Sequence, residues 1–173
     1  MRYDELRPMM RTGDAILWEG SGLLSWLIRR WSKYSHASLI VRMERYGDLR
    51  DTVFLVEALA TGLELRRLSQ RLEGYAGKAF WFQPSDLTTW QRDMIRSEAL
   101  KACGAGIGYD YKSLFRNILG HVSMNARSYF CSEFVWDMWV RVKALFTYGQ
   151  ENRAPRPGDI ESWVAGRTEE IEA

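Results

Sequence analysis

The clearest pattern of apolar positions in the chain lies between residues 128 and 145. Apolar side chains recur there every three or four residues in two neighbouring stripes: Phe130, Phe134, Met138, Val142 and Leu145, and Cys131, Val135 and Trp139. Two such stripes predict a helix that is surrounded by protein on most sides. Ser128 is expected to cap the start of this helix, which places Cys131 in its first turn.

Runs that are rich in β-branched and aromatic residues predict a sheet. Residues 36–43 and 52–59 are two such runs joined by a polar stretch, and they are expected to form a β-hairpin with a long loop. Three shorter runs extend the sheet: residues 15–18 after a turn at Gly13 and Asp14, residues 61–68, and residues 78–83 before Pro84. We therefore expect about five strands.

A surface helix is predicted at residues 88–103. It opens with a capping box, in which Thr88 and Gln91 bond each other's backbone, and it closes at Gly104. Its apolar side is expected to consist of Trp90, Met94, Ile95 and Leu100. The segment that follows residue 153 is expected to be extended and to end in a polar, acidic tail.

Residues 20–33 predict a short amphipathic helix. Its apolar side chains are Leu24, Leu27, Ile28 and Trp31. Packing against the core is the expected role of this helix. A lid over a groove or a lipid-facing patch is the alternative, because Trp18, Trp26 and Trp31 lie close together in the sequence.

Length and charge narrow the class of protein. The 173 residues suit a single domain, spanning 1–173, with a substantial core. The 24 basic and 22 acidic residues are too balanced to predict a nucleic-acid surface. No run approaches the roughly 18 apolar residues of a membrane span, and acidic residues near the N-terminus disfavour a signal peptide. The expected location is the cytoplasm, or outside the cell after export without a recognisable signal peptide, and the oligomeric state stays open.

Cysteine and histidine counts argue against a metal site. Cys103 and Cys131 allow at most one disulfide, and His36 and His121 lack the close spacing of zinc ligands. We therefore expect no metal and no cofactor. Cys103 is expected to pack in the last turn of the helix at 88–103, and His121, which follows a glycine, is expected in a loop or on the surface.

Cys131 is the candidate nucleophile, because the first turn of a helix favours a thiolate over a thiol. A cysteine taken alone is more often a small buried apolar residue, so the assignment depends on a base. A register that places residue 42 opposite residue 51 puts His36 directly opposite Glu57. Glu57 lies among apolar residues, where an ionised carboxylate needs a partner. The alternative for Glu57 is an edge-strand residue that faces water.

Thiol chemistry needs a nucleophile, a base, an acid that orients the base, and donors for an oxyanion. Cys131, His36 and Glu57 are expected to fill the first three roles. The backbone N–H of Cys131 is the first candidate oxyanion donor, and the side chain of Tyr34 or Ser35 is the candidate for a second. A cysteine helix packed on an antiparallel sheet that carries the base is the geometry of papain-type enzymes.

The motifs along the chain resemble the circularly permuted, NlpC-type papain-fold hydrolases, in the YiiX/YebB-like group. They are Thr12-Gly-Asp-Ala-Ile-Leu, Tyr34-Ser-His-Ala-Ser-Leu-Ile-Val, Val56-Glu-Ala, Thr61-Gly-Leu, Gly108-Tyr-Asp-Tyr and Tyr129-Phe-Cys-Ser-Glu-Phe-Val-Trp. Histidine precedes cysteine here, whereas the cysteine helix comes first in ordinary papain-fold enzymes. The resemblance implies an α+β fold with an antiparallel sheet on a central cysteine-bearing helix, and it implies Cys131 as nucleophile, His36 as base and Glu57 as orienting acid.

Three functions compete at this stage. The first is a cysteine peptidase or amidohydrolase that cleaves an amide or isopeptide bond, such as those of peptidoglycan stem peptides, through a thioester. The second is a lipid acyl hydrolase or acyltransferase that contacts membrane or acyl chain through Trp18, Trp26 and Trp31. The third is a non-catalytic binding module. Related lecithin:retinol acyltransferase-like enzymes carry asparagine before and histidine after the cysteine region, and Phe130 and Phe134 depart from that pattern. A small peptide-like or acyl substrate is the expected partner.

Overall fold

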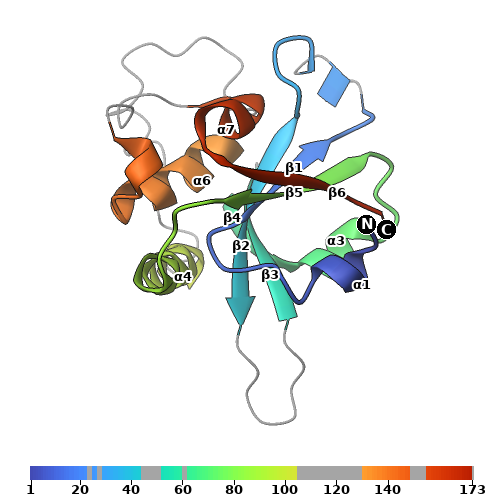
Figure 1. Cartoon of the computed structure of the whole chain (residues 1–173). Helices are drawn as coiled ribbons and strands as arrows, with labels where there is room; N and C mark the ends of the chain where they lie inside the picture. The colour runs from blue at the N-terminus through green and yellow to red at the C-terminus, as the bar shows by residue number, and fades with distance from the viewer. Residues whose placement is uncertain are drawn as a thin grey trace.

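A six-stranded antiparallel sheet with helices on both faces forms the framework of the protein (Figure 1). The computed structural model describes residues 1–22, 25–26, 29–43, 52–59, 62–104, 130–148 and 155–172, without the side chain of residue 130. The strand order is β4-β3-β2-β1-β5-β6, so β2 and β1 lie at the centre. The expected α+β class is therefore confirmed, with one strand more than predicted.

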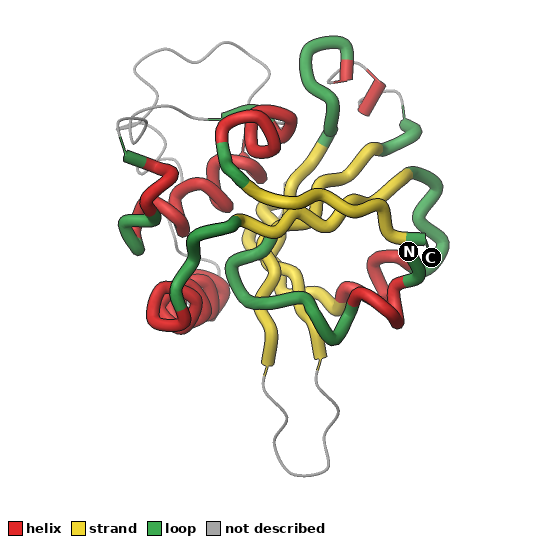
Figure 2. Tube along the Cα trace, in the orientation of Figure 1, coloured by secondary structure: helices red, strands yellow, loops and turns green. Residues whose placement is uncertain are grey.

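The elements have the following bounds. The strands are β1 (Ala15–Glu19), β2 (His36–Met43), β3 (Thr52–Leu59), β4 (Gly62–Arg67), β5 (Lys78–Pro84) and β6 (Gly166–Ile171). The helices are α1 (Tyr3–Leu6), α3 (Leu68–Leu72), α4 (Thr89–Gly104), α6 (Phe130–Arg141), a short 3-10 helix (Leu145–Thr147) and α7 (Pro157–Trp163). Figure 2 shows the strands as one layer, with α4, α6 and α7 on one side and α1 and α3 on the other.

The sheet separates two apolar cores. Side chains of α4, α6 and α7, such as Ile95, Phe134 and Ile160, pack on one face. Leu6 of α1 and Leu68 of α3 pack on the other. Because successive strand residues point to opposite faces, a central strand buried on both sides reads as a continuous apolar run. This explains why β2 and β3 were predicted with their observed bounds.

The predicted register of the hairpin is wrong by two residues. Residue 42 pairs with residue 53 rather than with residue 51. The connection over 44–51 is too long to fix a register in the way that a two-residue turn does. A shift of two residues leaves every side chain on its predicted face, because the side-chain period of a strand is two.

The observed β2–β3 ladder begins at Leu39, which pairs with Val56. Residues 36–38 of β2 lie beyond this ladder, although β1 still pairs with them on their other side. The first three residues of β2 therefore have one edge that β3 does not occupy.

The prediction for the C-terminal segment is wrong. These residues form α7 and the edge strand β6, which pairs antiparallel with β5. Pro157 opens the helix, and the Arg156 N–H donates to the Asp159 carboxylate at 2.9 Å. The pairing of β6 depends on backbone hydrogen bonds more than on apolar side chains, so the strand has no hydrophobic signature.

The capping box of α4 is confirmed. Its predicted apolar side is confirmed for Ile95 and Leu100 but wrong for Trp90 and Met94. The Thr88 N–H donates to the side-chain oxygen of Gln91 at 2.9 Å, and the Gln91 N–H donates to the Thr88 hydroxyl at 3.3 Å. Trp90 and Met94 are 64% and 37% exposed, whereas Gln91 and Arg92 are buried. Arg92 donates to the Asp14 carboxylate at 2.8 Å, so its burial is compensated.

The segment at 20–33 does not show the predicted core packing at Trp31, the one residue of the expected apolar side that lies within the described residues. Trp26 is 59% and Trp31 72% exposed, while Trp18 is fully buried in β1 and cannot face a lipid. Leu24, Leu27 and Ile28 lie outside the described residues.

Candidate functional site

Cys131 occupies the first turn of α6, as predicted, and is 2% exposed. The described side chains of α6 are mostly buried, because the helix packs on β2 and β3 with its apolar side. The proposed cap Ser128 lies outside the described residues. The position of Cys131 thus has the helix-terminal N–H groups that favour a thiolate.

Two backbone N–H groups bond the Cys131 sulfur. One comes from Ser132 in the same helical turn, and the other comes from Ala37 in β2. Ala37 is one of the residues that lie beyond the β2–β3 ladder. The early end of that ladder therefore leaves a backbone donor that reaches the sulfur across the helix–sheet boundary.

His36 links the cysteine to the carboxylate. Its Nε2 lies 3.0 Å from Oε1 of Glu57, and its ring also hydrogen-bonds the Cys131 side chain. Because Nε2 is used by Glu57, Nδ1 is the nitrogen that remains for the sulfur. The structure thus brings together the three residues that the sequence singled out, and the predicted proximity of His36 and Glu57 is confirmed.

Glu57 is fully buried and has further partners that the sequence did not reveal. Ser38, one residue before the start of the β2–β3 ladder, donates to the same Oε1 atom at 2.8 Å. The Ser38 hydroxyl in turn accepts a hydrogen bond of 2.7 Å from the indole of Trp18. Since Ser38 follows His36 by two residues, the strand period was the available signal for its location.

Arg71 of α3 approaches Glu57 from the opposite side. Its Nε lies 3.4 Å from Oε2, and its guanidinium lies over the rings of Trp18 and Tyr75, at 4.7 and 4.9 Å from their centroids. This residue was also missed, because a lone arginine in a short helix carries no local pattern. Its contacts fix a positive charge beside the buried carboxylate.

The pKa directions in this cluster agree with an ion pair between sulfur and imidazole. Burial raises the pKa of Cys131, but the His36 charge and hydrogen bond together with the two N–H donors lower it below its ordinary value. Burial lowers the pKa of His36, but Cys131 and Glu57 raise it above its ordinary value. Burial raises the pKa of Glu57, yet His36, Ser38 and Arg71 bring it below its ordinary value.

The structure places Tyr34 and Ser35 beside His36 but gives both hydroxyls other acceptors. The Tyr34 hydroxyl donates to Glu161 at 3.1 Å, and the Ser35 hydroxyl donates to the Trp18 carbonyl at 3.0 Å. Each hydroxyl has a single hydrogen, which these bonds occupy. The oxyanion role of either residue therefore stays a prediction.

Cys103 has an environment unlike that of Cys131. It is partly buried against the core at the end of α4, and burial raises its pKa. Its predicted packing role fits this position. His121 lies outside the described residues, so its predicted loop or surface location is untested.

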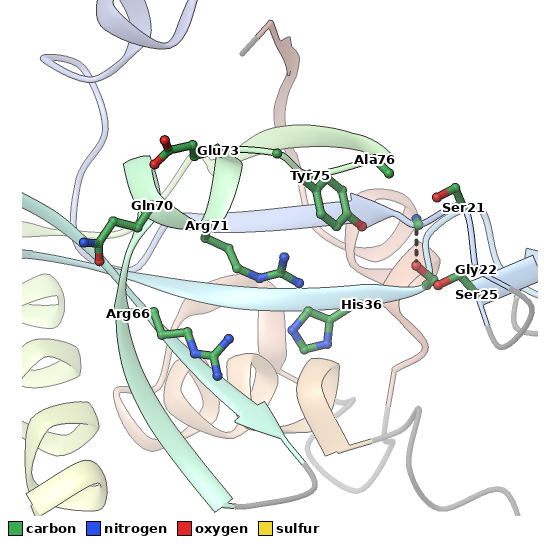
Figure 3. Close-up of a pocket in the computed structure, with 13 residues that line it drawn as sticks. Ser21, Gly22, Ser25, His36, Arg66, Gln70, Arg71, Glu73, Tyr75 and Ala76 are labelled. Atoms are coloured by element: carbon green, nitrogen blue, oxygen red, sulfur yellow. Dashed lines mark hydrogen bonds between the residues drawn. The ribbon is translucent and has the colours of Figure 1, made fainter.

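A pocket of about 590 Å³ opens next to His36 (Figure 3). The connection after β1, the start of β2, Arg66 of β4, Gln70, Arg71 and residues 73–76 line it. Because His36 borders both this pocket and Cys131, a molecule bound here lies beside the reactive pair.

Within the described ranges, no group of three or more His, Cys, Asp or Glu side chains is arranged to hold a metal ion. Every helix in that part of the chain is too short or too polar to cross a bilayer.

Comparison of the sequence with protein families and with curated proteins found no match. Comparison with solved structures found the crystal structure of the metalloprotein yiiX from Escherichia coli O157:H7, at a TM-score of 0.54 and 20% identity. The match covers 77% of this chain and 66% of that one, so the chain spans just under two thirds of its length. The protein therefore has a YiiX-like α+β fold.

Proposed function

We propose that this protein is a cysteine hydrolase that cleaves an amide or isopeptide bond. The observation that carries the proposal is the continuous series of contacts from Cys131 through His36 to Glu57, with the cysteine in the first turn of a helix. The histidine and glutamate precede the cysteine in the chain, which fits a permuted papain-like, NlpC-type arrangement on the YiiX-like fold. Bonds of peptidoglycan stem peptides are the candidate substrates.

In the proposed reaction the Cys131 thiolate attacks the substrate carbonyl carbon. The backbone N–H of Cys131 stabilises the resulting oxyanion, and the His36 imidazolium gives its proton to the leaving amine. A thioester remains, and His36 then takes a proton from the water that hydrolyses it. Glu57 holds the ring orientation and stabilises its positive charge throughout, in the manner of the orienting acid of a triad.

The pKa directions define the active pH range. The thiolate forms as pH rises through the lowered pKa of Cys131, and the imidazolium is lost as pH rises through the raised pKa of His36. The reactive ion pair is therefore present between these two values, and activity is expected to follow a bell-shaped profile.

Limited alkylation with iodoacetamide tests this proposal, with each cysteine quantified by mass spectrometry. Cys131 is expected to react roughly tenfold faster than Cys103 at pH 7, and His36→Ala is expected to abolish the difference. Turnover of amide substrates should fall with the same variant. A Cys131 that reacts no faster than Cys103 would instead favour a non-catalytic binding module.

Lipid acyl chemistry is the second candidate, because Trp26 and Trp31 are 59% and 72% exposed. Aromatic side chains at such exposure suit a membrane interface. Flotation with phosphatidylglycerol vesicles measures this contact. Trp31→Ser is expected to abolish flotation if lipid is the target, whereas Trp90→Ser changes an equally exposed tryptophan on α4 and serves as the control.

A further inference from the structure

The pocket beside His36 has a polar wall. Its described lining includes Ser21, Ser25 and Gln70. Tyr75 is the one phenyl-type ring in this lining, and no aliphatic side chain beyond alanine takes part among the described residues. A site for an acyl chain needs an extended apolar wall. This pocket therefore suits a hydrophilic part of a substrate.

The charges that line the pocket are mainly positive. Figure 3 shows the guanidinium groups of Arg66 and Arg71 projecting toward the ring of His36 from two sides, and Glu73 is the acidic residue of the lining. Glu57 is not part of the lining, and its two carboxylate oxygens contact two lining residues: Oε1 lies 3.0 Å from His36 and Oε2 lies 3.4 Å from Arg71. A neutral or positive substrate group would gain little from these two arginines.

Arg66 and Arg71 differ in how firmly they are held. Arg71 is stacked on two aromatic rings and paired with a buried carboxylate, so its position is fixed. Arg66 is 46% exposed, and its Nε and Nη2 both donate to one oxygen of Glu64, at 2.8 and 2.5 Å. An exposed ion pair of this kind contributes little stability, so Arg66 can exchange Glu64 for a substrate anion at small cost.

We propose that this pocket is a subsite for a carboxylate of the substrate, bound by Arg66 and attracted by the fixed charge of Arg71. The proposal rests on the proposed function, since His36 has to reach the leaving nitrogen while the neighbouring part of the substrate fills the pocket. The carboxylate then lies within one or two residues of the bond that is cleaved. The substrate class is a peptide-like amide with an acidic group next to the scissile bond.

Binding of N-acetylglycine and of its neutral analogue N-acetylglycinamide tests the subsite without any reaction. NMR titration of the wild-type protein, followed at the amide signals of Arg66 and Gly74, is expected to show roughly three- to tenfold tighter binding of the carboxylate. Arg66→Gln should remove this preference, and Glu64→Gln should increase it by releasing the competing acid. Arg167→Gln is the matched control, because Arg167 is an exposed strand arginine paired with a glutamate two residues away, outside the pocket.

Equal affinity for the two ligands, or a preference that survives in Arg66→Gln, would overturn the subsite.

A second pair of probes, iodoacetylglycine and iodoacetylglycinamide, tests whether the subsite directs a ligand toward the Cys131 sulfur. At each cysteine, the alkylation rate with iodoacetylglycine is divided by the rate with iodoacetylglycinamide. This ratio should be larger at Cys131 than at Cys103 in the wild type, and about equal at the two cysteines in Arg66→Gln. If both probes label Cys131 no faster than Cys103, the hydrolase proposal fails while the binding experiment still decides the subsite.

Discussion

Each nitrogen of the His36 ring has its own partner, and this assignment fixes the chemistry open to the residue. Nε2 faces Glu57 at 3.0 Å, which leaves Nδ1 for the sulfur. In the ion pair the imidazolium therefore donates its Nε2–H to Glu57 and its Nδ1–H to the sulfur. Trp18 and Ser38 extend the series, since the indole N–H donates to the serine hydroxyl and the hydroxyl donates to Glu57.

Glu57→Gln tests the electrostatic part of this arrangement. The amide keeps the shape and hydrogen-bonding capacity of the carboxylate but removes the charge that stabilises the imidazolium. The pKa of Cys131 should rise, so the acid limb of its alkylation profile should move to higher pH by about 1 to 3 units. The measurement is the iodoacetamide rate from about pH 4 to about pH 10, a range that spans the titration of thiols, alongside thermal unfolding.

Glu98→Gln is the matched control, because Glu98 is a partly exposed glutamate that pairs with Lys101 on α4, outside the pocket. Its profile should coincide with that of the wild type. If Glu57→Gln folds normally and also leaves the acid limb in place, the carboxylate does not stabilise the imidazolium.

At the scale of single residues, the sequence predicted the main contacts for partly incorrect reasons. His36 and Glu57 were paired through a register that is wrong by two residues, yet the same face of the sheet brings them together. Ser38 and Arg71 were missed, because their roles follow from the observed register and from α3, which the sequence pattern did not predict.

Helices and strands of this protein could be predicted from the sequence where their buried side chains are apolar. The predictions failed where the buried side chains are polar or where a strand pairs mainly through its backbone. β2 and β3 have the predicted bounds because both faces of each strand meet an apolar core. The burial of Arg92 on α4 was missed, because this side chain is held there by a carboxylate rather than by apolar contacts. β6 was missed because an edge strand can pair through its backbone with few apolar residues.

The buried ion pair between Arg92 of α4 and Asp14 is expected to stabilise the packing of this helix against the sheet. Arg92→Met keeps the bulk of the side chain but leaves a fully buried carboxylate without its cation. The free energy of unfolding should fall by roughly 3 to 5 kcal/mol, as measured by urea denaturation. Arg96→Met is the control. Arg96 lies one turn after Arg92 on α4 and pairs with the exposed Asp93, so its replacement should lower the free energy of unfolding by less than about 1 kcal/mol. Equal losses in the two variants would contradict a special role for the buried pair.

Glu133 of α6 introduces a pH dependence of stability. It is 8% exposed, and burial raises its pKa from the ordinary 4.5 to about 7. The folded state therefore keeps a proton that the unfolded state loses as pH rises above 4.5, so stability falls with pH and levels off above about 7. Glu133→Gln should remove this loss and be more stable than the wild type by up to about 3 kcal/mol at pH 8.

Asp137→Asn provides the comparison for Glu133, since Asp137 lies one turn later on α6 and forms a partly exposed pair with Arg141. The free energy of unfolding of Asp137→Asn should differ from that of the wild type by about the same small amount at about pH 5 and about pH 8. A Glu133→Gln difference that is equally flat would mean that Glu133 ionises normally in the folded protein.

At the scale of the whole molecule, the site is assembled from segments far apart in the chain. β2 and β3 supply His36 and Glu57, α3 supplies Arg71, and α6 supplies Cys131. The two ends of the described chain lie side by side (Figure 1), with Arg2 bridged to Glu172 and the N-terminal amine donating to the Glu170 carbonyl at 3.1 Å. Packing of α6 on the sheet, rather than the order of the segments, therefore holds the cysteine against the histidine.

This predicts that the chain order can be changed without loss of the site. A circular permutant that joins the two ends by a short Gly/Ser linker and opens the chain between α4 and α6 would place Cys131 before His36, as in ordinary papain-fold enzymes. Close termini make such a rearrangement tolerable, so the permutant should fold and keep the pH profile of Cys131 alkylation. A control permutant opened inside β3, between Val56 and Glu57, should fail to fold because it breaks a central strand. A folded first permutant whose Cys131 reacts like Cys103 would show that the connection between α4 and α6 is itself required to form the reactive pair.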